Sequence, residues 1–168
     1  MSTTDHDDDW LGVRQPERET LLGFRDWYAQ VVVNKLEDLP LEQASKVMTP
    51  SGISPLGIVK HLTWTEAGWY RDQFDGEEGF TEVSNEESFL LEPGDTVESV
   101  IAGYREECAR ARAIIDAAGS LDDLSARPAE FHGHTSLRWI LIHMLEETAR
   151  HAGHLDIMRE QLDGRTGD

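Results

Sequence analysis

Apolar residues recur every three or four positions in four segments of the chain, which is the spacing of an amphipathic α-helix. We expect these helices to cover residues 16–39, 54–74, 95–118 and 135–164. Stretches without a sustained period separate the second helix from the third and the third from the fourth. Four helices with one or two long connections are typical of an all-α four-helix bundle.

The ends of these segments carry helix start and stop signals. Ser54 followed by Pro55 has the form of an N-cap and a first helical residue. Asp95, with Glu98 three residues later, has the form of a capping arrangement, so we expect Asp95 to begin the third helix. Gly164 follows the last apolar position of the fourth helix and is expected to end it.

Composition limits the classes of protein that fit. A length of 168 residues suits one domain, which we place at residues 16–164 behind an acidic lead-in of residues 1–15. The chain has 33 acidic and 15 basic residues and a formal net charge of −18. A surface this negative repels phosphate backbones and anionic lipids, so we expect neither a nucleic-acid partner nor membrane binding.

Cys108 is the one cysteine and lies in a charged helical pattern. A single cysteine cannot form an internal disulfide, which fits a reducing compartment. The adjacent Glu106 and Glu107 are expected to raise the pKa of its thiol, so we interpret Cys108 as a half-buried helical residue rather than a nucleophile. The chain begins without the regions of a signal peptide, and no apolar run approaches the roughly 20 residues that cross a bilayer. We therefore expect a cytoplasmic protein.

Acidic and histidine side chains in the fourth helix are candidate metal ligands. Glu147 and His151 are four residues apart, so they share a helix face and can offer an oxygen and a nitrogen to one ion. A third ligand must come from another element, and His61 is the only histidine of the second helix. Because ligands in a bundle project inward from facing helices, these three residues are candidates for one divalent-metal site.

Two imidazoles and one carboxylate leave coordination positions open for water or substrate, as in catalytic sites. Acid and histidine pairs at this spacing also occur by chance. By spacing alone, Glu147 and His151 could therefore belong to a solvated polar face of the fourth helix. His61, on an apolar helix face, could equally be a hydrogen-bonded core histidine.

Two motifs resemble one known superfamily. The segment SPLGIVKHLTWTEAGWY at residues 54–70, combined with TSLRWILIHMLEETARHAGHLDIMREQLDG at residues 135–164, closely resembles the DinB-like four-helix metalloproteins. The resemblance covers nearly the whole chain after the lead-in and is greatest to a bacterial branch without an assigned function. It implies a divalent ion, often zinc or nickel, bound at the positions of His61, Glu147 and His151. Many relatives carry histidine in place of Glu147, but thiol-dependent isomerase and transferase relatives carry a carboxylate there.

The resemblance also implies an activity. Characterised relatives use a low-molecular-weight thiol such as mycothiol, bacillithiol or glutathione, so we expect a thiol S-transferase or a thiol-dependent isomerase. A metal at the open position would lower the pKa of a bound thiol and supply thiolate near neutral pH. Members of the superfamily often pair through helices, so a homodimer is expected as well.

The remaining histidines have other expected roles. His154 stands in H-A-G-H, where H-R-G-Q is frequent among relatives. We expect His154 to orient a ligand by a hydrogen bond without touching the metal, whereas a fourth ligand there would close the site. His143 is expected to pack or hydrogen-bond nearby. His132 and His134 lie in a glycine-containing loop and are expected to be solvated.

Two further functions stay open. One is a metal-dependent hydrolase, in which Glu66 or Glu146 would act as the base. The other is a non-enzymatic, metal-binding stress-response bundle.

Several large side chains lie near the predicted site in sequence. Trp64, Trp69 and Trp139 have helical spacing and are expected in the core, with an access cleft as the alternative. Arg138 and Arg150 are candidates for contacting an anionic group of the thiol.

Overall fold

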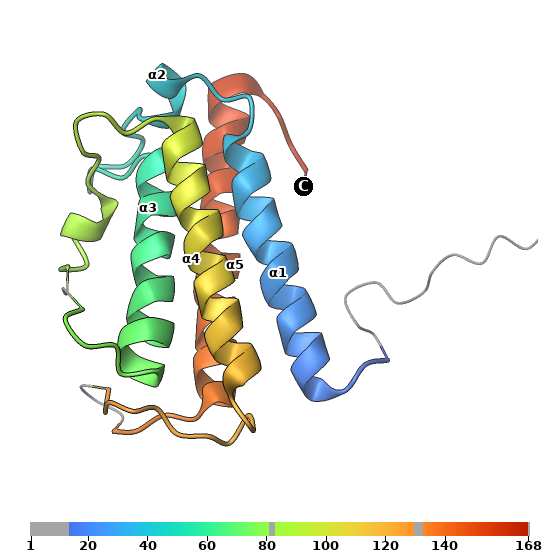
Figure 1. Ribbon diagram of the computed structural model, residues 1–168. Coiled ribbons are helices and arrows are strands. Elements are labelled where there is room, and N and C mark those ends of the chain that lie inside the picture. Colours follow the sequence, from blue (N-terminus) through green and yellow to red (C-terminus); the bar gives the residue numbers. More distant parts are fainter. Residues whose placement is uncertain (1–13, 81–82, 130–132, 168) are drawn as a thin grey trace, which may run out of the picture.

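The computed structural model describes residues 14–80, 83–129 and 133–167. Its four long helices, which lie side by side in Figure 1, are α1 (Glu17–Leu36), α3 (Pro55–Glu66), α4 (Val97–Ala117) and α5 (Leu137–Asp163). The predicted all-α bundle is confirmed. Helix α1 packs chiefly against α5, and α3 packs against both α4 and α5. Within the described part, no helix is both long and apolar enough to span a membrane.

The described residues also form three shorter elements. The second predicted helix changes at its end from α3 into the π-helix η2 (Ala67–Phe74). Helix α2 (Leu41–Ala44) and the 3-10 helix η3 (Glu87–Phe89) lie in connections that the apolar spacing did not mark as helical. The acidic lead-in predicted for residues 1–15 lies almost wholly outside the described residues.

The caps show one difference from the expectation. Ser54 caps α3 and Gly164, at φ 76°, ends α5, as predicted. Helix α4 is capped by Thr96 instead of Asp95: Thr96 Oγ1 accepts from the Ser99 backbone N–H at 3.1 Å, and Ser99 Oγ accepts from the Thr96 N–H at 2.9 Å. The expected Asp95 cap is therefore wrong. Asp95 accepts a hydrogen bond from Lys60 Nζ at 2.8 Å and ties the start of α4 to α3.

The core of the bundle is divided into two clusters of buried apolar side chains. Leu36, Leu62 and Leu155 belong to one cluster, and Leu22 and Ile140 belong to the other. On each long helix, one buried charged side chain stands between the residues of one cluster and those of the other, and together these four side chains form a charged layer. Its members are Arg25, Glu66, Glu107 and Glu147. Burying a charged side chain costs free energy unless it is paired, so this layer contributes less to stability than apolar side chains would, and it places polar groups inside the bundle.

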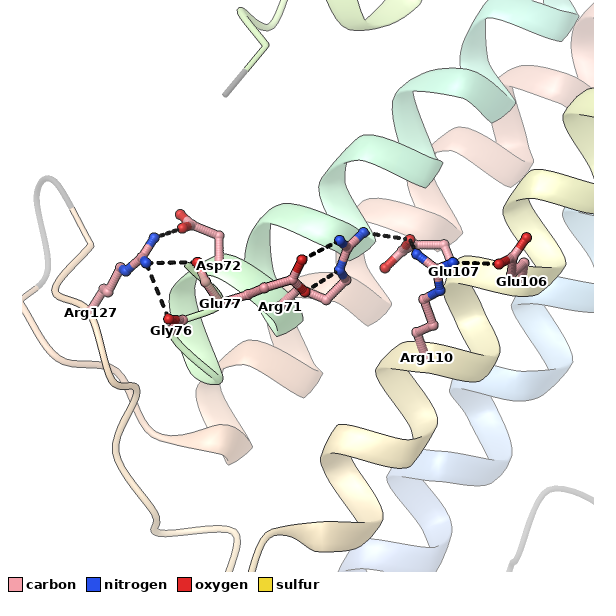
Figure 2. A network of polar contacts seen from close by, with 8 residues as sticks. All are labelled: Arg71, Asp72, Gly76, Glu77, Glu106, Glu107, Arg110 and Arg127. Atoms are coloured by element: carbon pink, nitrogen blue, oxygen red, sulfur yellow. Dashed lines mark hydrogen bonds and ion pairs between the residues drawn. The ribbon is translucent and has the colours of Figure 1, made fainter. Parts of the chain in front are cut away.

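An ion-pair network holds the C-terminal end of η2 in place (Figure 2). Arg71 forms two hydrogen bonds with Glu77, at 2.6 and 2.5 Å, and a third with Glu107 of α4 at 3.1 Å. Arg127, in the connection before α5, donates to the Glu77 carbonyl at 2.7 Å and pairs with Asp72. The π-helix is thereby tied both to α4 and to the connection between α4 and α5. Such helices are rare and are found frequently at functional sites.

Candidate metal centre

Three buried side chains converge between α3 and α5, and they are those expected to form the metal site. His61 comes from α3, and Glu147 and His151 come from α5. One potential ligand atom of each lies within 4.8 Å of the others. Nε2 of His61 is 3.2 Å from Glu147 Oε1, and Nε2 of His151 is 3.1 Å from the same oxygen. The solvated polar face considered from spacing alone is therefore wrong for Glu147 and His151, since both are buried.

A short segment outside the bundle orients His61. Nδ1 of His61 lies 2.8 Å from Ser88 Oγ, and this hydroxyl donates to the Asn85 carbonyl at 2.6 Å. A hydroxyl that already donates its proton accepts from its other neighbour, so the proton of His61 is placed on Nδ1. Nε2 then turns its lone pair toward Glu147. Phe89 stacks on the same ring, with centroids 4.0 Å apart and planes 8° apart.

Close packing brings this segment to α3. A Cβ atom on Gly57 would lie 2.6 Å from the carbonyl oxygen of Phe89, so only glycine permits the observed approach. Gly57 stands one turn before His61 on α3. The connection therefore reaches the imidazole because the helix lacks a side chain at this position.

The electrostatics of the cluster favour neutral imidazoles. Burial lowers the pKa of His61 to about 4, and His151 and Arg150 act in the same direction. Burial likewise lowers the pKa of His151 to about 4, with Arg150 contributing. Arg150 also forms an ion pair with Oε2 of Glu147. Neutral imidazoles keep the lone pairs that metal binding requires.

The donor set fits a divalent cation. Two ring nitrogens face one carboxylate oxygen, and at least the nitrogen of His61 offers a lone pair there rather than a proton. Nε2 of His61 and Oε1 of Glu147 are then two acceptors without a proton between them, and a cation bound there would satisfy both. Nitrogen and oxygen donors in this ratio suit zinc and similar ions.

The cluster forms part of the wall of a cavity of about 410 Å³. The cavity also contains Thr65, Trp69, Asn85, His143 and Arg150 in its lining. Polar groups from three different elements thus surround the donor atoms. The space is sufficient for a small molecule beside them.

His154 lies beside the cluster and not within it. Its Nδ1 is 3.4 Å from Nδ1 of His151, and it is not among the three residues whose donor atoms converge. His143 packs between aromatic rings, stacked on Trp139 at 5.0 Å and edge-on to Trp69 at 4.7 Å, as expected for a packing role. His134 binds the Ser125 carbonyl, and its side chain is exposed; His132 lies outside the described residues.

The tryptophans and arginines do not all follow the expectations. Trp64 and Trp139 are each 36% exposed, so their predicted place in the core is wrong, whereas Trp69 packs on one core cluster and borders the cavity. Arg150 lines the cavity, and its expected contact with an anionic group of the thiol stays a prediction. Arg138 instead pairs with Glu17 and Asp122 near the start of α5, because these carboxylates lie within its reach on the surface.

Neither carboxylate considered as a hydrolytic base is suited to that role. Glu66 is buried and accepts from Arg25 Nη2 at 2.6 Å, on the side of α3 that faces α1 and α4. Glu146 is exposed and pairs with Arg150 at 3.6 Å. Cys108 is half-buried, as expected, and burial raises the pKa of its thiol to about 12, which agrees with its interpretation as a non-nucleophilic residue. Glu66 contributes to this increase, rather than the adjacent glutamates that the sequence pointed to.

Sequence reasoning missed Ser88, Phe89 and Asn85. All three lie in the long acidic connection, where no helical period marks them. The available signal was the apolar run from Phe89 to Leu91 inside that acidic stretch. An apolar run in an otherwise charged connection indicates a segment that packs back onto the core.

Comparison with known proteins places the chain in a family. The sequence profile described as mycothiol-S-transferase matches residues 20–164, which include all four long helices apart from the first turn of α1. A search of curated proteins gives no match. The matched region contains the whole His61, Glu147 and His151 cluster, and the match confirms the resemblance to the DinB-like, mycothiol-related transferases. The chain therefore belongs to the mycothiol-S-transferase family.

Proposed function

We propose that this protein is a metal-dependent S-transferase that joins mycothiol to an electrophilic carbon. The observation that carries the proposal is the convergence of three buried donor atoms within 4.8 Å of one another in a cavity wall. The family supports mycothiol as the thiol, with bacillithiol as the alternative to be tested beside it.

We propose His61, Glu147 and His151 as the ligands of one divalent cation, with zinc or nickel expected from the donors. A cation held by these residues would lower the pKa of a bound thiol and so supply thiolate near neutral pH. Ser88 holds the proton of His61 on Nδ1 and leaves Nε2 for the site. We assign His154 to orienting His151, since it touches that imidazole and lies outside the converging group.

The reaction requires little more from the protein than positioning. The thiol sulfur forms a bond to the electrophilic carbon, the bond from that carbon to its leaving group breaks, and the leaving group takes the electron pair. The thiol proton goes to solvent. Arg150, Asn85 and Thr65 line the cavity and are suited to bind the polar groups of the thiol.

Transferase chemistry agrees better with the surroundings of the site than hydrolysis does. A hydrolase would use a base beside its attacking water, but Glu66 is paired with Arg25 and Glu146 lies on the surface. Thiol transfer requires no carboxylate base. A thiol-dependent isomerase would use the same site, and turnover tests with suitable substrates distinguish it.

Metal analysis and a coupled activity assay test the proposal. The purified protein should contain one equivalent of metal, and His61→Ala should lose most of it; equal metal in both would contradict the ligand assignment. With metal restored, monochlorobimane should lose chloride and gain the thiol only when mycothiol or bacillithiol is supplied. Turnover of esters or amides without any thiol would favour the hydrolase. Full metal occupancy without turnover would favour the non-enzymatic, metal-binding bundle.

The cellular setting remains a set of predictions. A cytoplasmic location is expected from the single cysteine. A homodimer is expected because members of the superfamily often pair through helices. The net charge of −18 continues to argue against nucleic acid as a partner.

A further inference from the structure

A separate apolar cavity adjoins the donor cluster. Its volume is about 330 Å³, and His151 belongs to its wall as well as to the wall of the polar cavity. The connection that precedes α3, the first turn of α3 and the last turns of α5 form it. Its apolar lining consists of Met48, Ile53, Ile58, Ile157 and Met158.

The charge of this cavity differs from that of its neighbour. Among the residues that the structure describes, those lining this cavity include no aspartate, glutamate, lysine or arginine, although 29% of the chain is charged. The polar cavity, by contrast, contains Glu147 and Arg150. A charged group entering the apolar cavity would lose hydration without gaining an ion pair, so the lining selects uncharged groups.

The rim of the apolar cavity exposes hydrophobic surface to solvent. Ile157 is 58% exposed on α5, and its neighbours in the wall include the flexible side chains of Met48 and Met158. Methionine adapts to ligands of different shapes. Covering such a rim with an apolar group removes hydrocarbon from water, at roughly 25 cal/mol per Å².

We infer that this apolar cavity binds the uncharged, hydrophobic part of the electrophilic substrate, while the polar cavity takes the thiol. The inference rests on the proposed transferase function and adds the class of its second substrate. His151 belongs to the walls of both cavities, so an acceptor held among Ile53, Ile157 and Met158 lies against one of the three proposed ligands. The protein would then act on compact apolar electrophiles rather than on anionic ones.

Binding can be tested without any reaction by using syn-(methyl,methyl)bimane, an inert analogue of monochlorobimane. With methyl-labelled methionine in the full chain, its addition should shift the NMR signals of Met48 and Met158. Met144 serves as the internal reference, because it lies buried in the other core cluster and outside this cavity. Signals that stay in place at Met48 and Met158 would overturn the inference, even if the enzyme turns over monochlorobimane.

A matched pair of surface variants tests the same point in turnover. Ile157→Glu places a charge at the rim, whereas Ile142→Glu alters an isoleucine of the same helix that is 51% exposed and lines neither cavity. We expect the KM for monochlorobimane to increase about tenfold in Ile157→Glu only, with metal content and thiol KM unchanged. Equal KM values in both variants would overturn the inference. Bimane shifts at Met48 and Met158 without any transferase activity would support the cavity and refute the proposed function instead.

Discussion

Nδ1 of His61 lies 2.8 Å from Ser88 Oγ, although the two residues are 27 positions apart and only His61 belongs to the helical bundle. This contact fixes which imidazole nitrogen faces Glu147. Substituting a residue that hydrogen-bonds to a metal ligand, without itself touching the metal, commonly weakens metal affinity by about 10- to 100-fold.

Ser88→Ala should therefore weaken metal binding about tenfold, because His61 loses the acceptor that orients its ring. Competition with a chelating indicator measures the affinity. Ser84→Ala is the matched control, since Ser84 lies in the same connection and its hydroxyl binds Glu87 rather than a proposed ligand. Equal affinity of the Ser88 variant and the unaltered protein would remove Ser88 from the site.

Gly57→Ala should disturb both stability and the site. The added methyl would approach the carbonyl oxygen of Phe89 to 2.6 Å, so η3 must move away from α3. We expect a loss of about 1–3 kcal/mol in the free energy of unfolding and a weaker metal affinity. Denaturant unfolding and the indicator assay measure the two effects.

The control for this change is another helical glycine. Gly103 on α4 has no atom within 4 Å of an added Cβ, so Gly103→Ala should leave the metal affinity unchanged and stabilise the helix by up to about 1 kcal/mol. A Gly57 variant that behaves like the Gly103 variant would show that the close approach is unimportant.

The metal-free protein should lose stability as the pH falls from about 6.5 to about 4. The folded-state pKa values of His61 and His151 are lowered to about 4, below the ordinary value of 6.5, so the unfolded chain takes up protons first. The stability that the two neutral imidazoles contribute is complete above the unfolded value and is lost as the pH falls toward the folded one.

Urea unfolding at a series of pH values, with chelator present, measures this dependence. His61→Gln keeps a side-chain amide next to Ser88 but does not titrate in this range. Its stability should depend less steeply on pH than that of the unaltered protein. Parallel curves would mean that His61 is not buried as a neutral imidazole.

Substituting Glu66 should lower the stability of the fold and leave metal binding unchanged. Its carboxylate lies 2.6 Å from Nη2 of Arg25, and both side chains are almost fully buried. Glu66→Gln removes the buried counter-charge of Arg25 and leaves, among the described residues, only the half-exposed Asp26, at 3.2 Å, as its ion-pair partner. Removing one partner of a buried ion pair typically costs about 3–5 kcal/mol. Metal content should remain that of the unaltered protein.

Thermal unfolding and metal analysis of this variant test both statements. Glu146→Gln is the control, because its ion pair with Arg150 is exposed and should contribute less than about 1 kcal/mol. A large loss of metal in Glu66→Gln would connect the buried pair to the site and contradict the separation of the two.

The sequence by itself determined the features that depend on neighbours along the chain. Helical periodicity predicted all four long helices, and the spacing of Glu147 and His151 placed them on one face of α5 because one turn separates them. Local chemistry was less decisive at the start of α4, where Thr96 rather than Asp95 forms the cap. Asp95 was already engaged by Lys60 of another helix, which no local pattern can show.

Tertiary structure alone decided the features that depend on contacts between distant segments. It brought His61 to Glu147, placed Ser88 and Phe89 on the imidazole, and left Trp64 partly exposed instead of in the core. These outcomes depend on how the helices pack and on where a long connection returns. Apolar spacing states that a helix has a buried face, but it does not state which residue of another segment covers each position on that face.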